Sequence, residues 1–432
     1  MLDLIIRNAT LPDGRAGVDI GVQDQRIAVI EPRLRAQAGQ EIDAAGYLVT
    51  PPFVDPHFHL DATLSLGRPR FNESGTLLEG IQIWAEQQPL ITVEDVKKRA
   101  GEQCRWAIAQ GCLAIRSHVD VADPSLAAVE ALLELRDEMR PWIDVQLVAF
   151  PQNGYFRDAG AAENLRRALD MGVEVVGGIP HFERTMAEGA ASVKTLCELA
   201  AERGLLVDLH CDETDDPLSR HVESLAFESQ RLGLQGRVTG SHLTSMHSMD
   251  NYYVSKLQPL MREAGLSAIA NPLINIAIQG RHDSYPKRRG MTRIKELLAA
   301  GINVGLGHDC VMDPWYSLGS HDMLEVAHMA LHVGQMTGRA EMREIFACAT
   351  HRSAQIMHLD GYGLEPGCHA DFVVLQARDT IEAIRLRANR LWVIRRGDVI
   401  AQGPPREVTL SLGGEESKVD FLADKRLNTP EN

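Results

Sequence analysis

Residues 52–61 read Pro52-Phe53-Val54-Asp55-Pro56-His57-Phe58-His59-Leu60-Asp61, and this stretch decides how the whole chain is interpreted. The apolar run from Tyr47 to Val54 predicts a buried strand, and two histidines follow at its carboxyl end. Because side chains on a strand alternate, His57 and His59 point the same way and can bind one metal ion. Barrel enzymes place their chemistry at such strand ends.

The middle of the chain alternates between strand-like apolar runs and helical segments such as 125–139 and 190–203. This alternation is typical of parallel βα units. The candidate strands lie near residues 47–55, 113–119, 143–150, 173–178, 205–210, 237–242, 267–271 and 303–308. Eight such units predict an α/β fold with a (β/α)8 barrel of the TIM type.

The two ends of the chain have a β pattern that is too short to fold alone. We expect them to pair into one small β-sandwich. The predicted domains are an accessory β-sandwich of residues 1–52 and 367–432 and a catalytic barrel of residues 53–366. The polar tail from Gly413 onward predicts a loose arm.

The composition restricts the partners and the compartment of this protein. A formal net charge of −15 on 432 residues argues against nucleic acid and anionic membrane surfaces as partners. The sequence has no apolar run of about 18 residues and no recognisable signal peptide. Seven scattered cysteines suit reduced thiols. We therefore expect a cytoplasmic protein that acts on a small molecule.

The predicted strands deliver acidic and imidazole side chains to one end of the barrel. Strand one ends at His57 and His59, strand five at His210 and Glu213, strand six at His242, and strand eight at Asp309. Since the carboxyl ends of barrel strands surround one opening, we expect these side chains to converge there.

This arrangement, with the split β-sandwich, resembles the amidohydrolase superfamily, and within it the bacterial cytosine deaminases. The likeness runs over nearly the whole chain. The stretches that carry it are Pro51 to Asp61, Ser74 to Gly80, Val148 to Gln152, His210 to Glu213, Gly307 to Asp309 and Asp313 to Tyr316.

The resemblance implies a metal site formed by His57, His59, His210 and Asp309. Three imidazoles and one carboxylate suit one divalent ion such as Zn²⁺ or Fe²⁺, with a fifth position for water. Many two-metal amidohydrolases carry a carboxylated lysine on strand four, and residues 171–183 contain no lysine. This absence favours one metal. The resemblance also implies a homo-oligomer.

The implied reaction is hydrolytic deamination of a free pyrimidine base, from cytosine or 5-methylcytosine to uracil or thymine plus ammonia. Glu213 would carry the proton from the attacking water to the ring nitrogen, while His242 and Asp309 hold the attacking oxygen. Four residues would contact the substrate: Gln152 through its amide, Trp315 as an apolar wall, Leu77 through its backbone carbonyl, and Cys310 beside C5 of the ring.

One position departs from the cytosine deaminase pattern. Those enzymes carry two aspartates after Gly-His, and this chain has Asp309-Cys310 instead. A neutral thiol is smaller and less polar than a carboxylate, and it would leave space beside C5 of the ring. We therefore expect the pocket to accept 5-methylcytosine, although neutral drift at a tolerant site would produce the same exchange.

Other interpretations stay open at this level. The same residues would serve an amidohydrolase that deaminates another amino-heterocycle, such as isoguanine or an aminotriazine. A catalytically silent barrel scaffold is a further alternative, against which the intact ligand set and Glu213 argue. His181-Phe182-Glu183 matches the H-x-E of the small zinc deaminases, which also need P-C-x-x-C. The chain has no C-x-x-C, so that class is excluded, although His181 lies near the predicted barrel opening.

Overall fold

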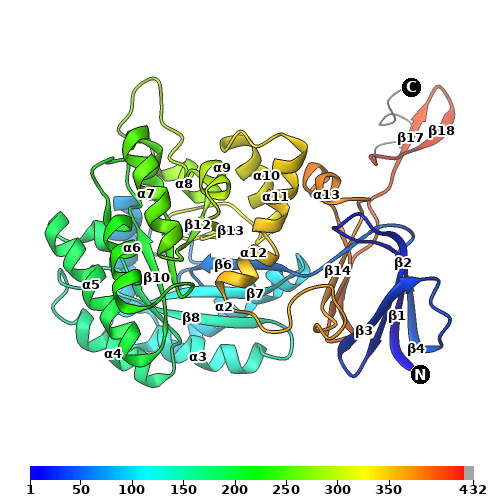
Figure 1. The fold of residues 1–432 in the computed structure, drawn as a ribbon, viewed down its shortest axis with the longest axis horizontal. Coiled ribbons are helices and arrows are strands. Elements are labelled where there is room, and N and C mark those ends of the chain that lie inside the picture. Colours follow the sequence, from blue (N-terminus) through cyan, green and yellow to red (C-terminus); the bar gives the residue numbers. More distant parts are fainter. Residues whose placement is uncertain (423–432) are drawn as a thin grey trace.

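The computed structural model describes residues 1–422, and its larger part is a barrel of parallel strands surrounded by helices (Figure 1). Within the described residues eight strands follow one another around the barrel in chain order. They are β6 (Phe53–Phe58), β7 (Cys112–Asp120), β8 (Asp144–Phe150), β9 (Val175–Gly178), β10 (Leu206–Cys211), β11 (Val238–His242), β12 (Ser267–Ala270) and β13 (Asn303–Leu306). The predicted (β/α)8 class is therefore confirmed.

The barrel closes between its first and last strands. The backbone N–H of His59 donates to the carbonyl of Asp309 at 3.0 Å, and the N–H of Asp309 donates to the carbonyl of His57 at 2.9 Å. These two hydrogen bonds join the segment of His57 and His59 directly to Asp309, which follows β13. Closure of the barrel and assembly of the site thus depend on the same few backbone groups.

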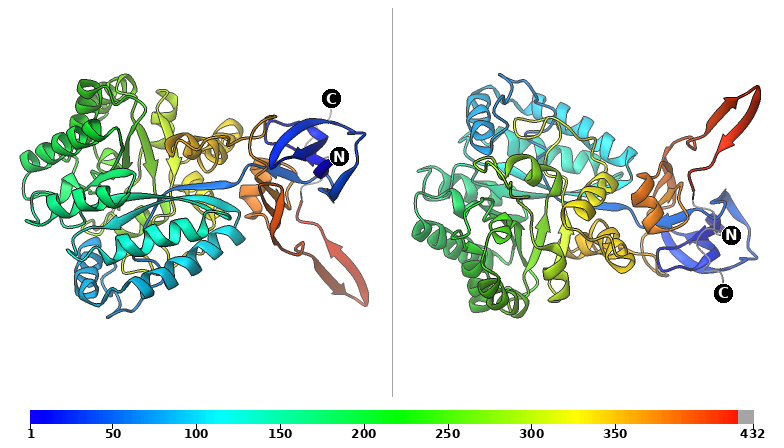
Figure 2. Two further views of the ribbon diagram at one scale, coloured as in Figure 1. Left: turned by 90° about the horizontal axis from the view of Figure 1, so that it is seen from below. Right: turned by 90° about the horizontal axis from the view of Figure 1, so that it is seen from above.

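Helices cover the outside of the barrel (Figures 1 and 2). They are α2 (Val93–Ala109), α3 (Ala127–Met139), α4 (Ala161–Met171), α5 (Met186–Arg203), α6 (His221–Leu232), α7 (Asn251–Glu263), α9 (Ile294–Ala299), α10 (Met323–Val333), α11 (Arg339–Cys348) and α12 (His351–Ile356). The two helical stretches predicted at 125–139 and 190–203 correspond to α3 and α5. Helix α5 starts at Met186 rather than at the predicted residue 190, because the Thr185 side chain caps its first turn by accepting from the N–H of Glu188.

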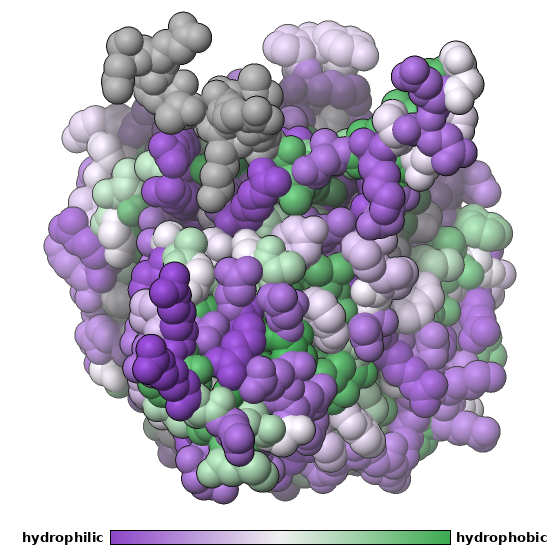
Figure 3. Space-filling model, turned by 90° about the vertical axis from the view of Figure 1, so that its right-hand side faces the viewer, coloured by the Kyte–Doolittle hydropathy of each residue, from purple (hydrophilic) through white to green (hydrophobic). Residues whose placement is uncertain are grey.

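Strands from both chain ends form the smaller part of the molecule (Figure 1). They are β1 (Leu2–Thr10), β2 (Ala16–Gln23), β3 (Arg26–Pro32), β4 (Ala38–Asp43), β5 (Leu48–Thr50), β14 (Phe372–Leu375), β15 (Arg390–Arg395) and β16 (Asp398–Gln402). In the described residues they make one continuous sheet in which β5 pairs with β14, and their apolar side chains share a separate core. Helix α13 (Thr380–Leu386) lies between β14 and β15 in the chain. On the end of the molecule that this sheet occupies, hydrophilic residues cover most of the visible face (Figure 3).

The single strand predicted at 47–55 is wrong in one respect, because the run contains two strands that belong to different sheets. Strand β5 pairs with β14 in the sheet made from the chain ends, whereas β6 begins the barrel. The division falls at Pro51-Pro52, since proline lacks the N–H that a continuing ladder needs.

The polar segment after Gly413 differs in part from the predicted loose arm. Strands β17 (Val408–Leu412) and β18 (Glu415–Val419) form an exposed antiparallel hairpin that reaches away from the rest of the molecule in Figure 2. The last part of the predicted arm, 423–432, lies outside the described residues. None of the helices in the described part of the chain combines the length and apolar character that a membrane crossing needs.

Candidate active site

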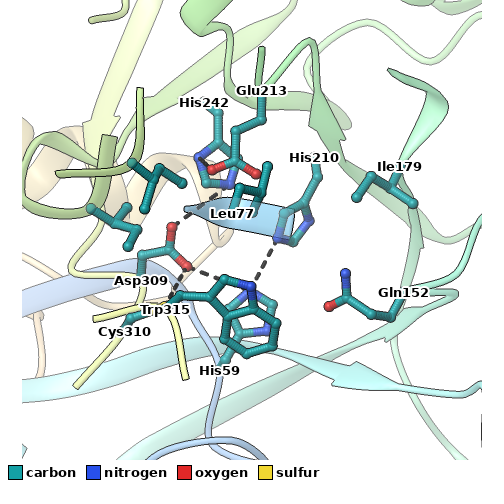
Figure 4. Close-up of a pocket in the computed structure, with 12 residues that line it drawn as sticks. His59, Leu77, Gln152, Ile179, His210, Glu213, His242, Asp309, Cys310 and Trp315 are labelled. Atoms are coloured by element: carbon teal, nitrogen blue, oxygen red, sulfur yellow. Dashed lines mark hydrogen bonds and ion pairs between the residues drawn. The ribbon is translucent and has the colours of Figure 1, made fainter. Parts of the chain in front are cut away.

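The carboxyl ends of four barrel strands bring the predicted metal ligands and the predicted catalytic residue His242 to one place. His57 lies in β6, His210 in β10 and His242 at the end of β11, while Asp309 follows β13 (Figure 4 shows the last three). The backbones of His242 and Asp309 adopt left-handed conformations, with φ of 73° and 71°. Such conformations are costly away from glycine and cluster at functional sites. The strained turns aim both side chains into the barrel opening.

The donor atoms of the four predicted ligands face one another. The Nε2 atoms of His59 and His210 lie 3.0 Å apart. Asp309 Oδ1 lies 3.4 Å from His59 Nε2 and 3.6 Å from His57 Nε2. Among the residues that the structure describes, neither ring nitrogen of His57 has a hydrogen-bond partner, although the side chain is fully buried. Buried polar groups without partners are rare, so this arrangement fits a bound cation.

The charge states of these groups also fit a metal ion. Burial lowers the pKa of His57 and His210 well below the usual range, and that of His59 to about 3. The imidazoles are therefore neutral, as metal ligands must be. Burial, together with the neighbouring Glu213 and Asp313, raises the pKa of Asp309 well above its usual value. A cation would relieve this crowding of carboxylates.

Glu213 and His242 lie next to each other on the far side of Asp309. Glu213 Oε1 is 3.3 Å from His242 Nδ1, and His242 Nε2 is 3.7 Å from Asp309 Oδ2. Burial raises the pKa of Glu213 to about 8. A carboxyl with a pKa near neutrality can both accept and donate a proton under ordinary conditions.

Two asparagines that the sequence analysis missed hold the His242 ring. The Nδ2 atoms of Asn271 and Asn275 lie 3.2 and 3.1 Å from His242 Nδ1. Asn271 directly follows β12, and Asn275 is on α8 (Pro272–Ile278). Asn271 stands at the end of the predicted strand 267–271, and a polar residue at a strand end is a candidate site residue. Nothing in the nearby sequence indicated that its partner would be His242.

The pocket beside these groups contains nearly all predicted site residues. Those lining it are His59, Leu77, Gln152, His210, Glu213, His242, Asp309, Cys310 and Trp315, while His57 is fully buried beneath them. About 370 Å³ of space free of protein atoms lies within this pocket, part of it open solvent.

An apolar wall completes the pocket. Cys310 belongs to a cluster with Ile274 and Ile278 of α8, against which Leu77 and Trp315 pack. Ile179, which follows β9, also lines the pocket. The three isoleucines were missed, because an apolar residue after a predicted strand looks the same whether it faces a ligand or the core. Figure 4 shows Gln152 across the pocket from Asp309 and His242.

Helix α1 (Leu77–Gln87) places Leu77 in the pocket, and its residues Gly80 and Trp84 contact neighbouring parts of the barrel. Trp84 Nε1 donates to Asp120 Oδ2 at 2.8 Å. A Cβ on Gly80 would lie 2.3 Å from the Trp315 ring, so only glycine permits this packing. Gly80 ends one of the stretches that carry the family resemblance, and the close approach of the Trp315 indole ring explains why glycine stands there.

Comparison with known proteins identifies relatives of similar length. A model of the amidohydrolase family matches residues 40–405. The 5-methylcytosine deaminase from Klebsiella pneumoniae, whose crystal structure holds 5-fluorocytosine, is 44% identical, with a TM-score of 0.91 over 94% of this chain and 98% of that chain.

Two curated proteins are more distant. The N-isopropylammelide isopropyl amidohydrolase of Pseudomonas sp. (strain ADP) is 31% identical over 412 residues, which are 93% of this chain and 97% of that protein. The pterin deaminase of Rhizobium rhizogenes is 29% identical over 429 residues, which are 95% of this chain and 97% of that protein. The enzymes similar to this chain thus act on several nitrogen heterocycles.

Proposed function

Because the chain belongs to the amidohydrolase family, we propose that it is a metal-dependent deaminase of 5-methylcytosine and cytosine. The products are thymine or uracil and ammonia. The observation that carries this proposal is the pocket itself, where the Gln152 amide faces the Glu213, His242 and Asp309 group across a narrow space beside an apolar wall. The 44% identity to a 5-methylcytosine deaminase over 94% of the chain supports the choice of base.

The metal ion is proposed to be a single Zn²⁺ or Fe²⁺ held by His57, His59, His210 and Asp309. When bound, such an ion lowers the pKa of a water molecule to about 7 and so supplies hydroxide at neutral pH. Nitrogen-rich ligand sets of this kind disfavour Mg²⁺ and Ca²⁺, which prefer oxygen ligands.

The residues around the pocket would carry out the remaining chemistry. Glu213 takes the proton of the attacking water and delivers it to the ring nitrogen next to the amino-bearing carbon, and His242 and Asp309 orient the attacking oxygen. The Gln152 amide offers a donor and an acceptor to the ring edge that carries the N1 and O2 atoms. As the tetrahedral adduct collapses, the proton of its new hydroxyl moves to the amino group, the C4–N bond breaks, C4=O forms and ammonia leaves. Trp315 covers the ring, and Leu77 offers a backbone carbonyl.

The Cys310 thiol supports 5-methylcytosine as a substrate. Burial raises the pKa of this thiol well above its usual value, so it stays neutral. It lies among Ile274, Ile278 and Trp315, where a methyl group on C5 of the ring would find apolar neighbours. An apolar group placed on such a wall is favoured over a polar one.

A second candidate is hydrolysis of a C–N bond on an aminotriazine, which the similarity to N-isopropylammelide isopropyl amidohydrolase favours. A silent scaffold is the weaker alternative, because Glu213 lies 3.3 Å from His242 beside all four proposed metal ligands. We further propose a homo-oligomer, which light scattering on the purified protein would test.

The deciding experiment measures the released amine for a panel of substrates: ammonia from 5-methylcytosine, cytosine and isoguanine, and the alkylamine from an N-alkyl aminotriazine. The protein is loaded with Zn²⁺ or Fe²⁺, and Glu213→Gln prepared in parallel subtracts any contaminating deaminase. We expect the highest kcat/KM for one of the two pyrimidines. Faster turnover of isoguanine or the triazine, or no turnover of any compound, contradicts the proposal.

A further inference from the structure

The segment His181-Phe182-Glu183 lies directly behind the pocket, and the proposed chemistry gives it no task. Strand β9 ends at Gly178, Ile179 lines the pocket, and a short 3-10 turn, Pro180–Phe182, leads to Glu183. The segment occupies the end of strand four, where the sequence offers no lysine for a second metal. His181 contacts the strand that carries His210, and Glu183 contacts the loop that carries Gln152. The substrate would lie between this strand and this loop.

Both carboxylate oxygens of Glu183 accept hydrogen bonds from one loop. The side chain is nearly buried, at 8% exposure. Oε1 accepts from the N–H of Tyr155 at 2.6 Å and from that of Phe156 at 3.1 Å, and Oε2 accepts from the N–H of Arg157 at 2.9 Å. A carboxylate that collects several backbone N–H groups holds them in a fixed arrangement, because such charge-assisted bonds are the strong ones.

The loop that Glu183 holds carries Gln152. Strand β8 ends at Phe150, and the next residues turn tightly, with the N–H of Gly154 donating to the carbonyl of Pro151 at 2.9 Å. Gly154 has a φ of +92°, and a Cβ there would lie 3.1 Å from Glu183 Oε2. The carboxylate therefore packs against the same turn that places the Gln152 side chain in the pocket.

The other polar group of the segment binds the metal side of the pocket. His181 Nδ1 donates to the backbone carbonyl of His210 at 3.1 Å. The Arg157 guanidinium stacks on the Phe182 ring at 4.2 Å, which joins the loop to the segment a second time. One short segment thus contacts both the strand of a proposed metal ligand and the loop of the proposed base-reading amide.

We infer that Glu183 is a positioning residue that sets the place of the Gln152 amide relative to the reacting groups. The inference rests on the proposed function, since it assigns Gln152 to the ring edge. Backbone N–H groups that lose an acceptor can shift the loop, and a misplacement of about 1 Å at a positioned group can cost up to about 100-fold. The expected consequence is weaker recognition of the base.

The first test compares four proteins in a double-mutant cycle: wild type, Glu183→Gln, Gln152→Ala and the double variant. In Glu183→Gln, an NH₂ group replaces one acceptor oxygen and faces N–H donors. We expect KM for the best pyrimidine of the panel to rise about tenfold, with a smaller change in kcat. In the Gln152→Ala background, the same substitution should change KM less than twofold.

Glu174→Gln is the matched control. Glu174 Oε2 also accepts a backbone N–H from β8, that of Leu147 at 3.0 Å, but it lies before β9, at the other end of that strand from the pocket. This variant should keep the KM of wild type. Equal KM changes from Glu183→Gln in both backgrounds would show a general structural effect and overturn the inference.

A second measurement does not depend on turnover. Hydrogen exchange at the amides of Tyr155, Phe156 and Arg157 should become faster in Glu183→Gln at unchanged metal content, and stay slow in the Glu174→Gln control. Unchanged exchange overturns the inference even if the enzyme is a pyrimidine deaminase. Faster exchange in a protein that deaminates no pyrimidine overturns the proposed function and leaves the loop contact supported. If Glu183→Gln does not fold, Gly154→Ala disturbs the same contact from the loop side and should give the same defects.

Discussion

Replacement of Cys310 by aspartate tests the substrate assignment most directly. The Cys310 side chain is 3% exposed and packs with Ile274 and Ile278 on the apolar side of the pocket. Its Sγ lies 3.5 Å from Asp309 Oδ1. Cys310→Asp therefore places a carboxyl group where the structure has a neutral thiol, next to the proposed site of the C5 substituent.

The expected size of the effect follows from the groups involved. Favourable burial of one methyl group contributes about 0.8 kcal/mol, which an aspartate at this wall would remove. Poor solvation of the new polar group beside the methyl adds to this loss. We expect the ratio of kcat/KM for 5-methylcytosine to that for cytosine to fall at least about tenfold, which corresponds to about 1.4 kcal/mol.

The assay measures kcat/KM for both bases in wild type, Cys310→Asp and Cys310→Ala, each at matched metal content because Asp309 is adjacent. Cys310→Ala removes the sulfur without adding a polar group, so its ratio should stay within about threefold of wild type. An unchanged ratio in Cys310→Asp, or a wild type that cannot use 5-methylcytosine, would refute the reasoning and leave cytosine as the better substrate.

Four further predictions concern the metal, the proton carrier (two of them) and the barrel interior. Elemental analysis should find about one Zn or Fe per chain, lost in His210→Ala; two tightly bound ions or none would contradict the site. Glu213→Gln should retain the metal and lose about 10²–10⁴-fold in kcat, so a variant within a few-fold of wild type would place the proton transfer elsewhere. The same variant tests a pH effect on the metal-free protein: burial raises the pKa of Glu213 from 4.5 to about 8. Between these two pKa values the folded protein holds a proton that the unfolded chain releases, so the free energy of unfolding falls as the pH rises from 4.5 to about 8. In Glu213→Gln, the thermal midpoint should depend less on pH over this range. Finally, Arg116 Nη1 pairs with Asp208 at 2.9 Å, and both side chains are buried. Arg116→Met should lower the free energy of unfolding, measured in urea, by about 3–5 kcal/mol because it leaves a buried charge unpaired. A decrease below about 1 kcal/mol would show that Asp208 is neutral or solvated.

Much of the site was predictable because barrel chemistry gathers at strand ends. His57, His59, His210 and Asp309 were identified from the positions of polar residues after apolar runs, and their side chains lie within 3.0–3.6 Å of one another in pairs in the structure. The fold class followed from alternating β and α patterns, which local sequence determines strongly. Leu77 and Gln152 came from the family resemblance alone, since nothing in their local sequence points to a pocket.

What the sequence by itself determined is the kind of chemistry and the barrel that carries it, because residue types and their periodicity are local properties. Tertiary structure alone decided which sheet each half of 47–55 joins, that Asn271 and Asn275 hold His242, and that Glu183 binds the loop after β8. The physical reason is that these contacts join distant residues; Glu183 and Tyr155 are 28 positions apart in the chain. A backbone N–H has no side-chain signature, so its acceptor becomes known only when the chain has folded.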